Sequence, residues 1–345
     1  MTDPEIEADP TVPRGPAGRS RLTAVVQSNT CVCREHYLLR VRLDRRMQPT
    51  RPGQFVQVGC RPPLEVLDET QILGRSLPWT GRGWPQVQQA ELCASLALLR
   101  RPLSIAGRHD DAAGTSLEFV HRVVGQGTAW LAGLRPGDVV DLLGPLGNGF
   151  GLPGDKAIGV LVGGGVGLPP MFYLARLLRD EGWQTVAVLA ARSRDLLPVS
   201  FEDDVEPDVQ GLPMHSVSEF ARLGVASVVT TDDGSCGLKG LITDGLEKTL
   251  AMMGPQHRRL VVVFCCGPTP MMRATARLAE AHGVACQACL EQAMACGLGT
   301  CQSCVMPIRH TADAPHGVTA DGTPWRYRLT CTEGPVFDAK EVIWG

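Results

Sequence analysis

The sequence has 345 residues, more than a single hydrophobic core usually organises, which favours two or three domains. Its 33 basic and 36 acidic residues leave a net charge of -3, which argues against nucleic acid or an anionic membrane as a partner. Residues 1–20 are expected to be a disordered tail, and they lack the apolar run of a signal peptide, so we expect a soluble cytoplasmic protein. The sequence has thirteen cysteines, and in a reducing compartment clustered cysteines more often bind metal than form disulfides.

Short apolar runs broken by glycine and proline extend from residue 21 to residue 153. Several of them alternate between polar and apolar side chains with period two, which predicts an antiparallel β-barrel or sandwich, of which we expect the barrel. The expected strands lie at 23–27, 37–43, 54–59, 117–124 and 138–143. The rhythm fails at about 61–99, where prolines, glycines and tryptophans follow one another closely, and there we predict a long insertion.

Three segments of this half carry groups that suit a flavin dinucleotide. Arg101 begins a predicted strand with a hydroxyl three residues later, so its guanidinium can clamp a pyrophosphate while Ser104 reaches the flavin or its ribityl chain. Arg122 lies on the next strand, and residues 127–128 open a predicted helix whose N-terminus can receive phosphate. Taken singly, each arginine could be a solvated strand charge; taken together, the segments favour a flavin site.

From residue 154 to residue 285 the chain alternates between strand and helix patterns. The runs at 157–162, 186–191, 227–230 and 260–265 are largely apolar, as are strands of a parallel sheet covered by helices on both faces. This segment is therefore predicted to be a nucleotide-binding α/β domain.

A glycine-rich turn follows the first of these strands. Gly165 and Gly167 fit the first two positions of a dinucleotide-binding fingerprint, and Pro170, which suits a first helical turn, replaces the third glycine. A purely structural turn is the alternative. Residues 266–268 end another predicted strand, at the edge where open α/β sheets bind ligands. Residues 192–195 contain an acidic residue, which suits a ribose diol, and two arginines, which could hold a 2′-phosphate, so the residues alone do not choose between NAD and NADP. The candidate nicotinamide-binding residues are Gly163, Gly165, Gly167, Cys266, Gly267 and Pro268.

Residues 286–345 return to a loop pattern and are treated as a third, small unit. Four of their cysteines have the spacing of plant-type ferredoxins, with four and then two intervening residues before a distant fourth thiol. These metal-ligand candidates are Cys296, Cys301, Cys304 and Cys331. A zinc site is the alternative, although such sites usually present two C-x2-C pairs. A second C-x2-C, Cys286 with Cys289, is interpreted as nonligating because the set of four is complete.

Together these segments resemble the ferredoxin-NADP reductase superfamily, and within it the electron transfer subunits of NAD-dependent dihydroorotate dehydrogenase. The matching segments are 101–104, 127–128, 144–150, 163–170, 231–235, 266–270, 290–304 and 331–337, in the family's order. The resemblance implies that FAD is held by Arg101, Pro102, Leu103, Ser104, Val120, His121, Arg122, Gly127 and Thr128. It also implies that the four cysteines hold a 2Fe-2S cluster and that the nicotinamide cofactor is NAD.

The same resemblance implies a heterotetramer with two FMN-containing catalytic subunits, in pyrimidine biosynthesis. Electrons from dihydroorotate would reach the partner's FMN, cross the cluster and FAD, and leave as hydride to NAD; because these groups carry the chemistry, no side chain is expected to be catalytic. The alternative keeps the cofactors but makes the chain an NAD(P)H-dependent reductase component that serves an oxygenase, a hydrogenase or a ferredoxin.

Overall fold

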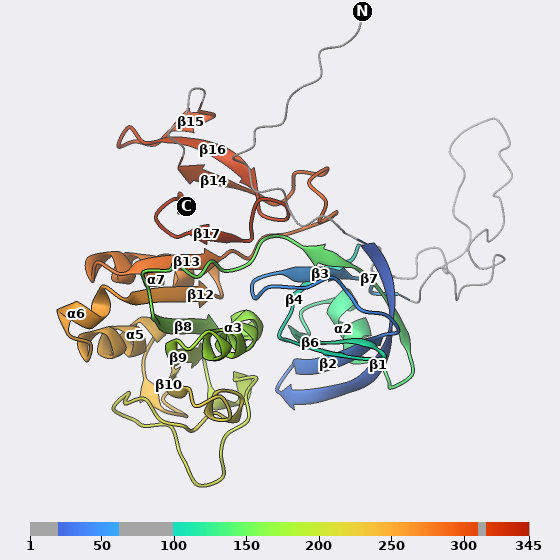
Figure 1. Ribbon diagram of the computed structural model, residues 1–345, viewed down its shortest axis with the longest axis horizontal. Helices are drawn as coiled ribbons and strands as arrows, with labels where there is room; N and C mark the ends of the chain where they lie inside the picture. The colour runs from blue at the N-terminus through green and yellow to red at the C-terminus, as the bar shows by residue number, and fades with distance from the viewer. Residues whose placement is uncertain (1–19, 62–98, 310–314, 345) are drawn as a thin grey trace, which may run out of the picture.

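The computed structural model describes residues 20–61, 99–309 and 315–344. Almost all of the predicted tail at 1–20 and of the predicted insertion at about 61–99 lies outside the described residues. Within them, the chain forms a curled antiparallel sheet, a larger α/β body beside it, and a small sheet set apart from both (Figure 1).

The first sheet has seven described strands in the order β4-β3-β7-β1-β2-β6-β5, all antiparallel. Its strands are β1 (Ser20–Cys33), β2 (His36–Leu43), β3 (Phe55–Val58), β4 (Arg101–Ser104), β5 (Gly107–Asp111), β6 (Gly114–Arg122) and β7 (Val139–Leu146). Residues 105 and 106 connect the two edge strands, β4 and β5. The Ile105 N–H donates to the carbonyl of Gln54, next to β3, at 3.1 Å, and the Ala106 N–H donates to the carbonyl of Glu118, on β6, at 2.8 Å. The sheet therefore curls toward closure, and the predicted antiparallel barrel is confirmed as a half-barrel.

The barrel core is apolar and includes one short helix. Alternating residues of the strands, such as Leu39 and Phe119, are fully buried, and Leu131 of α2 (Gln126–Ala132) packs among them. The helix predicted to open at residues 127–128 is thus present. Strand β5 was not predicted, because Arg108 to Asp111 supply no apolar side chain and an edge strand does not need one.

The second sheet has the order β11-β10-β9-β8-β12-β13-β17, and its described strands are parallel except for β17. The strands are β8 (Ile158–Gly164), β9 (Gln184–Ala191), β10 (Ala226–Thr231), β11 (Leu238–Lys239), β12 (Val261–Cys266), β13 (Ala285–Cys289) and β17 (Val336–Asp338). The chain runs from β8 to β9 on one side and later places β12 on the other. A topological switch point, where such sheets bind nucleotides, therefore lies between the ends of β8 and β12.

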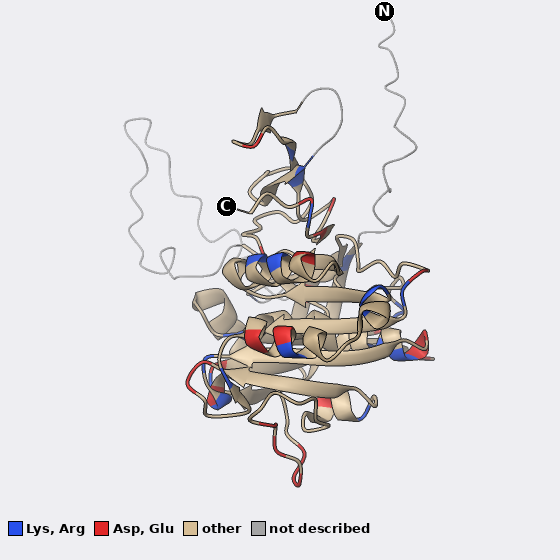
Figure 2. Ribbon diagram, turned by 90° about the vertical axis from the view of Figure 1, so that its left-hand side faces the viewer, with Lys and Arg blue, Asp and Glu red and all other residues tan. Residues whose placement is uncertain are grey.

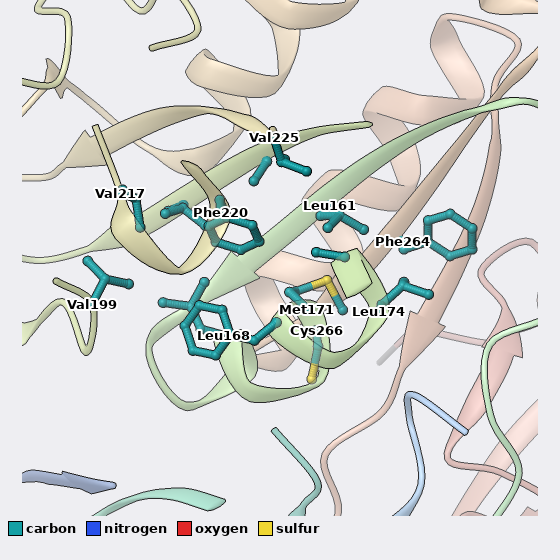
Figure 3. Close-up of a cluster of buried hydrophobic side chains, with 14 of the residues drawn as sticks. Leu161, Leu168, Met171, Leu174, Val199, Val217, Phe220, Val225, Phe264 and Cys266 are labelled. Carbon is teal, nitrogen blue, oxygen red and sulfur yellow. The ribbon is translucent and has the colours of Figure 1, made fainter. Parts of the chain in front are cut away.

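Helices cover both faces of this sheet, as its largely apolar strands predicted. Helix α3 (Leu168–Asp180) packs Leu168 and Leu174 against Leu161 and Phe264 on one face (Figure 3). The opposite face is covered by α5 (Ile242–Ala251) and α7 (Thr269–Ala281). The short helices α4 (Ser218–Ala221) and α6 (Pro255–Arg258) complete this body. No helix among the described residues is long and apolar enough to span a membrane.

The loop pattern predicted from residue 286 onward is wrong in part. The described residues there include a sheet of order β14-β16-β15, made of β14 (Val305–Arg309), β15 (Gly317–Val318) and β16 (Pro324–Leu329). This sheet stands apart from the two larger ones in both views (Figures 1 and 2). These strands are short, and β16 alternates aromatic residues with arginine rather than apolar with polar, so the periodicity gave little signal.

Candidate functional site

The two larger bodies and the cysteine-rich segment meet at a cavity of about 440 Å³. The barrel wall comprises Phe55, Arg101, Pro102, Leu103, Ser104, Val120, His121, Arg122, Val124 and Thr128. The α/β body supplies Val166, Gly167, Cys266 and Cys289, and the cysteine-rich segment supplies Leu290, Glu291, Gln292, Met294 and Pro335. Eight of the nine residues predicted to hold FAD thus line one cavity; the ninth, Gly127, lies directly behind Arg101.

Arg101 and the turn into α2 form one end of this cavity. A Cβ placed on Gly127 would lie 3.1 Å from Arg101 Nε, so the bare glycine lets the guanidinium approach the backbone closely. The Thr128 hydroxyl accepts hydrogen bonds from the backbone N–H groups of Val124 and Gly125, at 2.9 and 3.2 Å. Thr128 therefore shapes the turn, while Arg101 supplies the positive charge that a phosphate needs.

His121 is the buried polar group of this wall. Only 2% of the residue is exposed, its ring stacks on Tyr37 with centroids 5.8 Å apart, and neither ring nitrogen has a hydrogen-bond partner in the described chain. Burial, followed by the charge of His36, lowers the pKa of His121 to about 4. A neutral imidazole offers one donor and one acceptor, so a polar ligand such as a flavin would satisfy an otherwise orphaned group.

This buried imidazole predicts an acid sensitivity. An unfolded chain protonates His121 near pH 6.5, whereas the folded protein holds it neutral until about pH 4, so stability is lost as the pH falls between these values. The free energy of unfolding should drop by ~2 kcal/mol at pH 5 through this residue alone. Urea unfolding should show that the free energy of unfolding falls less between pH 7 and pH 5 in His121→Gln than in the wild type. In His257→Gln, a variant of an exposed residue, it should fall as much as in the wild type. Equal pH dependence in all three proteins would refute the assignment to His121.

Arg122 lies between this cavity and a second one of about 550 Å³. Its guanidinium pairs with Glu35, with Nη2 and Nε at 2.7 and 2.9 Å from Oε2, and this hydrogen bonding holds the pKa of Glu35 below its usual range. The second cavity follows the switch point of the parallel sheet. Its lining includes Gly164, Gly165, Val166, Ala190, Arg192, Asp232, Thr243, Pro268, Pro270 and Met271. Val166 lines both cavities, so the two meet at the glycine-rich turn.

The glycines predicted to hold the nicotinamide cofactor do different things. Gly165 has a φ of +53° and no atom within 4 Å of an added Cβ, so it leaves the turn open. A Cβ on Gly167 would lie 2.1 Å from the Cys266 carbonyl oxygen, so this glycine brings the two strand ends together. Gly163 instead serves packing, because its Cβ would overlap Leu168. Of the six predicted residues, Gly165 and Pro268 line the second cavity, Gly167 and Cys266 the first, and Gly163 and Gly267 neither.

The four candidate cluster ligands lie in one region beside the first cavity. Cys304 and Cys331 are both 1% exposed and belong to one buried group with Phe55 and Leu146 of the barrel. The Thr330 N–H and hydroxyl both donate to the Cys304 carbonyl, at 3.1 and 2.7 Å, which brings the distant fourth cysteine to the loop.

The loop from Cys296 to Cys304 turns its backbone donors toward sulfur. The N–H groups of Leu298 and Cys301 point at Cys296 Sγ, at 3.3 and 3.5 Å, and Gly297 and Gly299 adopt φ of +70° and +91° to allow this path. Such donors stabilise thiolates and the charge of a reduced cluster. This chemistry fits an iron–sulfur group.

Two of the four thiols, Cys301 and Cys331, have pKa values shifted in opposite directions. Hydrogen bonding by Ser303 lowers the pKa of the exposed Cys301 to about 6, whereas burial, with contact to Cys304, raises the pKa of Cys331 to about 12. Within the described residues, no three His, Cys, Asp or Glu side chains already stand in an arrangement that could hold a metal ion. Iron binding would therefore displace thiol protons and draw the loop closer together.

Phe55 links the cavity to the cysteines, and the sequence argument did not single it out. Its ring lines the first cavity and also packs against Cys304 and Cys331. One side-chain layer therefore separates the space next to Ser104 from the buried thiols. Only its place within a predicted strand could have drawn attention to this residue. Gln292 and Met294, which the cysteine-rich segment contributes to the first cavity, were likewise not singled out from the sequence.

The chain has the fold of ferredoxin reductase-type oxidoreductases, and its C-terminal segment matches an iron–sulfur binding domain. The solved structure of an NADH-dependent reduced ferredoxin-NADP oxidoreductase, studied for flavin-based electron bifurcation, shares this fold with a TM-score of 0.65 and 24% identity, over 93% of this chain and 90% of that one. A family described as the iron–sulfur cluster binding domain of dihydroorotate dehydrogenase B matches residues 291–343.

Curated relatives narrow the class further. The electron transfer subunit of dihydroorotate dehydrogenase B (NAD+) from Geobacillus kaustophilus is 37% identical over 249 residues, which is 71% of this chain and 80% of the relative. The subunit of the same name from Geobacillus thermodenitrificans is 32% identical over 328 residues, 94% of this chain and 99% of the relative. The chain belongs to the family of electron transfer subunits of NAD-dependent dihydroorotate dehydrogenase B.

Proposed function

We propose that this chain holds FAD and a 2Fe-2S cluster and passes electrons between an FMN-containing catalytic subunit and NAD. The cavity shared by the barrel, the switch point and the cysteine-rich segment carries this proposal. When bound, FAD exchanges electrons singly or in pairs and so joins a one-electron cluster to a two-electron nicotinamide. The domain limits 21–153, 154–285 and 286–345 belong to the proposal, with β13 and β17 linking the last segment to the α/β sheet.

The residues of the chain act by binding and orienting these groups. Arg101 would hold the FAD pyrophosphate against Gly127, and His121 would give the flavin a neutral hydrogen-bonding partner. Cys296, Cys301, Cys304 and Cys331 would hold the two irons, with Phe55 between them and the flavin cavity. Gly167 keeps the turn at residues 164–167 close to Cys266, where the nicotinamide would meet the flavin.

NAD is the proposed acceptor because the family's members carry it in their names. The second cavity offers Asp232, whose carboxylate could accept hydrogen bonds from a ribose diol, but it also offers Arg192, so the lining is compatible with NAD without requiring it. The proposed assembly is a heterotetramer of two such chains with two catalytic subunits that oxidise dihydroorotate in pyrimidine biosynthesis. The proposed compartment is the cytoplasm, whose reducing conditions keep thiols available to iron.

Anaerobic purification of the chain together with its partner tests the proposal. We expect about one FAD, two irons and two sulfides per chain, and an FMN-containing partner identified by mass. A single zinc without iron would refute the cluster, and a Rieske or hydrogenase partner would favour the alternative reductase component.

Arg101→Ala tests the flavin site separately. Loss of charge-assisted hydrogen bonds to a phosphate should weaken FAD binding about 10- to 100-fold, measured as flavin retained after gel filtration and by titration of the apoprotein. Arg100→Ala is the matched control, because Arg100 pairs with Asp141 and does not line the cavity. Equal FAD affinity in the Arg101 variant and the wild type would contradict the assignment.

A further inference from the structure

One buried side chain between the flavin cavity and the cysteine loop has unmet hydrogen-bonding capacity. Gln57, on β3, is 0% exposed, and neither its Nε2 nor its Oε1 has a partner among the described residues. Leaving a buried amide unpaired is costly, and most buried polar groups in native proteins are paired. The orphaned amide therefore points to a partner that is present only when the site is loaded.

The position of Gln57 on its strand identifies which site that is. Side chains two residues apart on a strand share a face, so Gln57 lies on the same face as Phe55, which packs against Cys304 and Cys331. A Cβ built on Gly297 would lie 2.8 Å from Gln57 Cγ and 3.0 Å from Nε2. The amide thus ends against the residue that directly follows Cys296.

The surroundings favour sulfur over flavin as the missing partner. Gln57 lines neither the 440 Å³ nor the 550 Å³ cavity, so it does not face the space proposed for FAD or NAD. Phe55 and Leu146 beside it are apolar, and Leu146 also lies against the Gly297 position. Gly297 directly follows Cys296, one of the four candidate ligands, and a cysteine sulfur that binds iron can accept a hydrogen bond from an amide N–H.

We propose that the Gln57 amide donates a hydrogen bond to a sulfur of the iron–sulfur cluster and thereby raises its reduction potential, an inference that rests on the proposed function. Reduction adds negative charge to the cluster, and an N–H donor to sulfur stabilises that charge. Gln57 is in this sense a positioning and tuning residue, contributed by the barrel to a group that is held by the C-terminal segment.

Potentiometric titration of the purified complex, with electron paramagnetic resonance of the reduced cluster, tests this role. Gln57→Met keeps the volume but removes the donor, so the cluster midpoint should become more negative. At the wild-type midpoint the ratio of reduced to oxidised cluster should fall about three- to tenfold, with unchanged iron content and unchanged flavin midpoint. Gln57→His, whose imidazole can donate an N–H, should restore much of the ratio.

Gln54→Met is the matched control. Gln54 is also buried and lies three residues away, but its amide is satisfied, with Oε1 accepting from Arg51 N–H at 2.8 Å and Nε2 donating to the Gly147 carbonyl at 2.7 Å. Its replacement should lower stability without moving the cluster midpoint. A shift equal to that of Gln57→Met would mean that loss of any buried amide has this effect and would overturn the proposal.

Two further outcomes would overturn it: an unchanged cluster midpoint in an iron-replete Gln57→Met protein, or a shift confined to the flavin. If Gln57→Met fails to fold, the wild type labelled with 15N in its glutamine amides carries the test. We expect a nitrogen coupling to the reduced cluster that is absent in Gln57→His, and its absence from the wild type would refute the bond. A wild-type protein without any iron would instead refute the proposed function itself.

Discussion

Cys301→Ser is expected to abolish electron delivery between the chain and its partner while leaving reduction of the flavin by NADH largely intact. Cys301 is the exposed thiol of the loop, and serine is a much poorer ligand for iron than a thiolate. The two cavities proposed for the flavin and the nicotinamide are lined by no residue of this loop between 296 and 304, so flavin reduction should continue. Partner reduction should fall at least 100-fold in a coupled assay, and anaerobic stopped-flow measurement of flavin bleaching by NADH should change less than about twofold.

Cys31→Ser is the appropriate control for that variant. Cys31 is also exposed, lies on β1 of the barrel and is absent from both cavities. It should transfer electrons to the partner at the normal rate. If Cys301→Ser did so as well, the cluster would not lie on the path between the flavin and the partner.

Gly167→Ala is expected to have the largest effect on the nicotinamide reaction. The new Cβ would come within 2.1 Å of the Cys266 carbonyl oxygen, and because both atoms belong to backbone-fixed positions, the ends of β8 and β12 must separate. A displacement of about 1 Å between reacting groups can cost about 100-fold in rate. The variant should therefore retain FAD but reduce it with NADH about 100-fold more slowly, and its free energy of unfolding should fall by ~1–3 kcal/mol.

Gly254→Ala provides the comparison for this substitution. Gly254 has an ordinary φ of -65° and no atom within 4 Å of an added Cβ, and it lies before α6, away from both cavities. It should react with NADH at the wild-type rate. A Gly167→Ala protein with normal flavin reduction would show that the close contact with Cys266 does not position the nicotinamide.

Periodicity predicted the two large sheets because their central strands carry the strongest patterns. Alternation along β2 and β6 and the apolar runs of β8 and β12 are direct consequences of one-sided and two-sided burial. Edge strand β5 and the small sheet escaped prediction, since neither needs an apolar face to exist. Strand β5 is held by a tight hairpin with β6, and β15 and β16 pair locally as well, so backbone hydrogen bonds rather than an apolar pattern define them.

The candidate site could be predicted as separate segments but not as one cavity. Arg101, Gly127 and the four cysteines can be recognised from residue type and spacing. In the structure Arg101 lines the first cavity, and the buried Cys304 and Cys331 pack against Phe55, which lines it too. Phe55 and Gln57 carry no such signal, because a phenylalanine and a glutamine in a strand are ordinary. Likewise, Gly163 was among the candidate nicotinamide-binding residues, but it lines neither cavity and lies close against Leu168. Such assignments depend on contacts that only the folded chain creates.

The cysteine-rich segment leaves the parallel sheet at β13 and returns to it at β17, the adjacent strand, while Asn148 of the barrel donates to the Val336 carbonyl at 2.8 Å and accepts from its N–H at 2.9 Å. The segment that carries the sulfurs is therefore paired with the α/β sheet and hydrogen-bonded to the barrel. Any hinge motion that opened the α/β body away from the barrel would have to break these hydrogen bonds, so the segment that carries the cysteines opposes such opening.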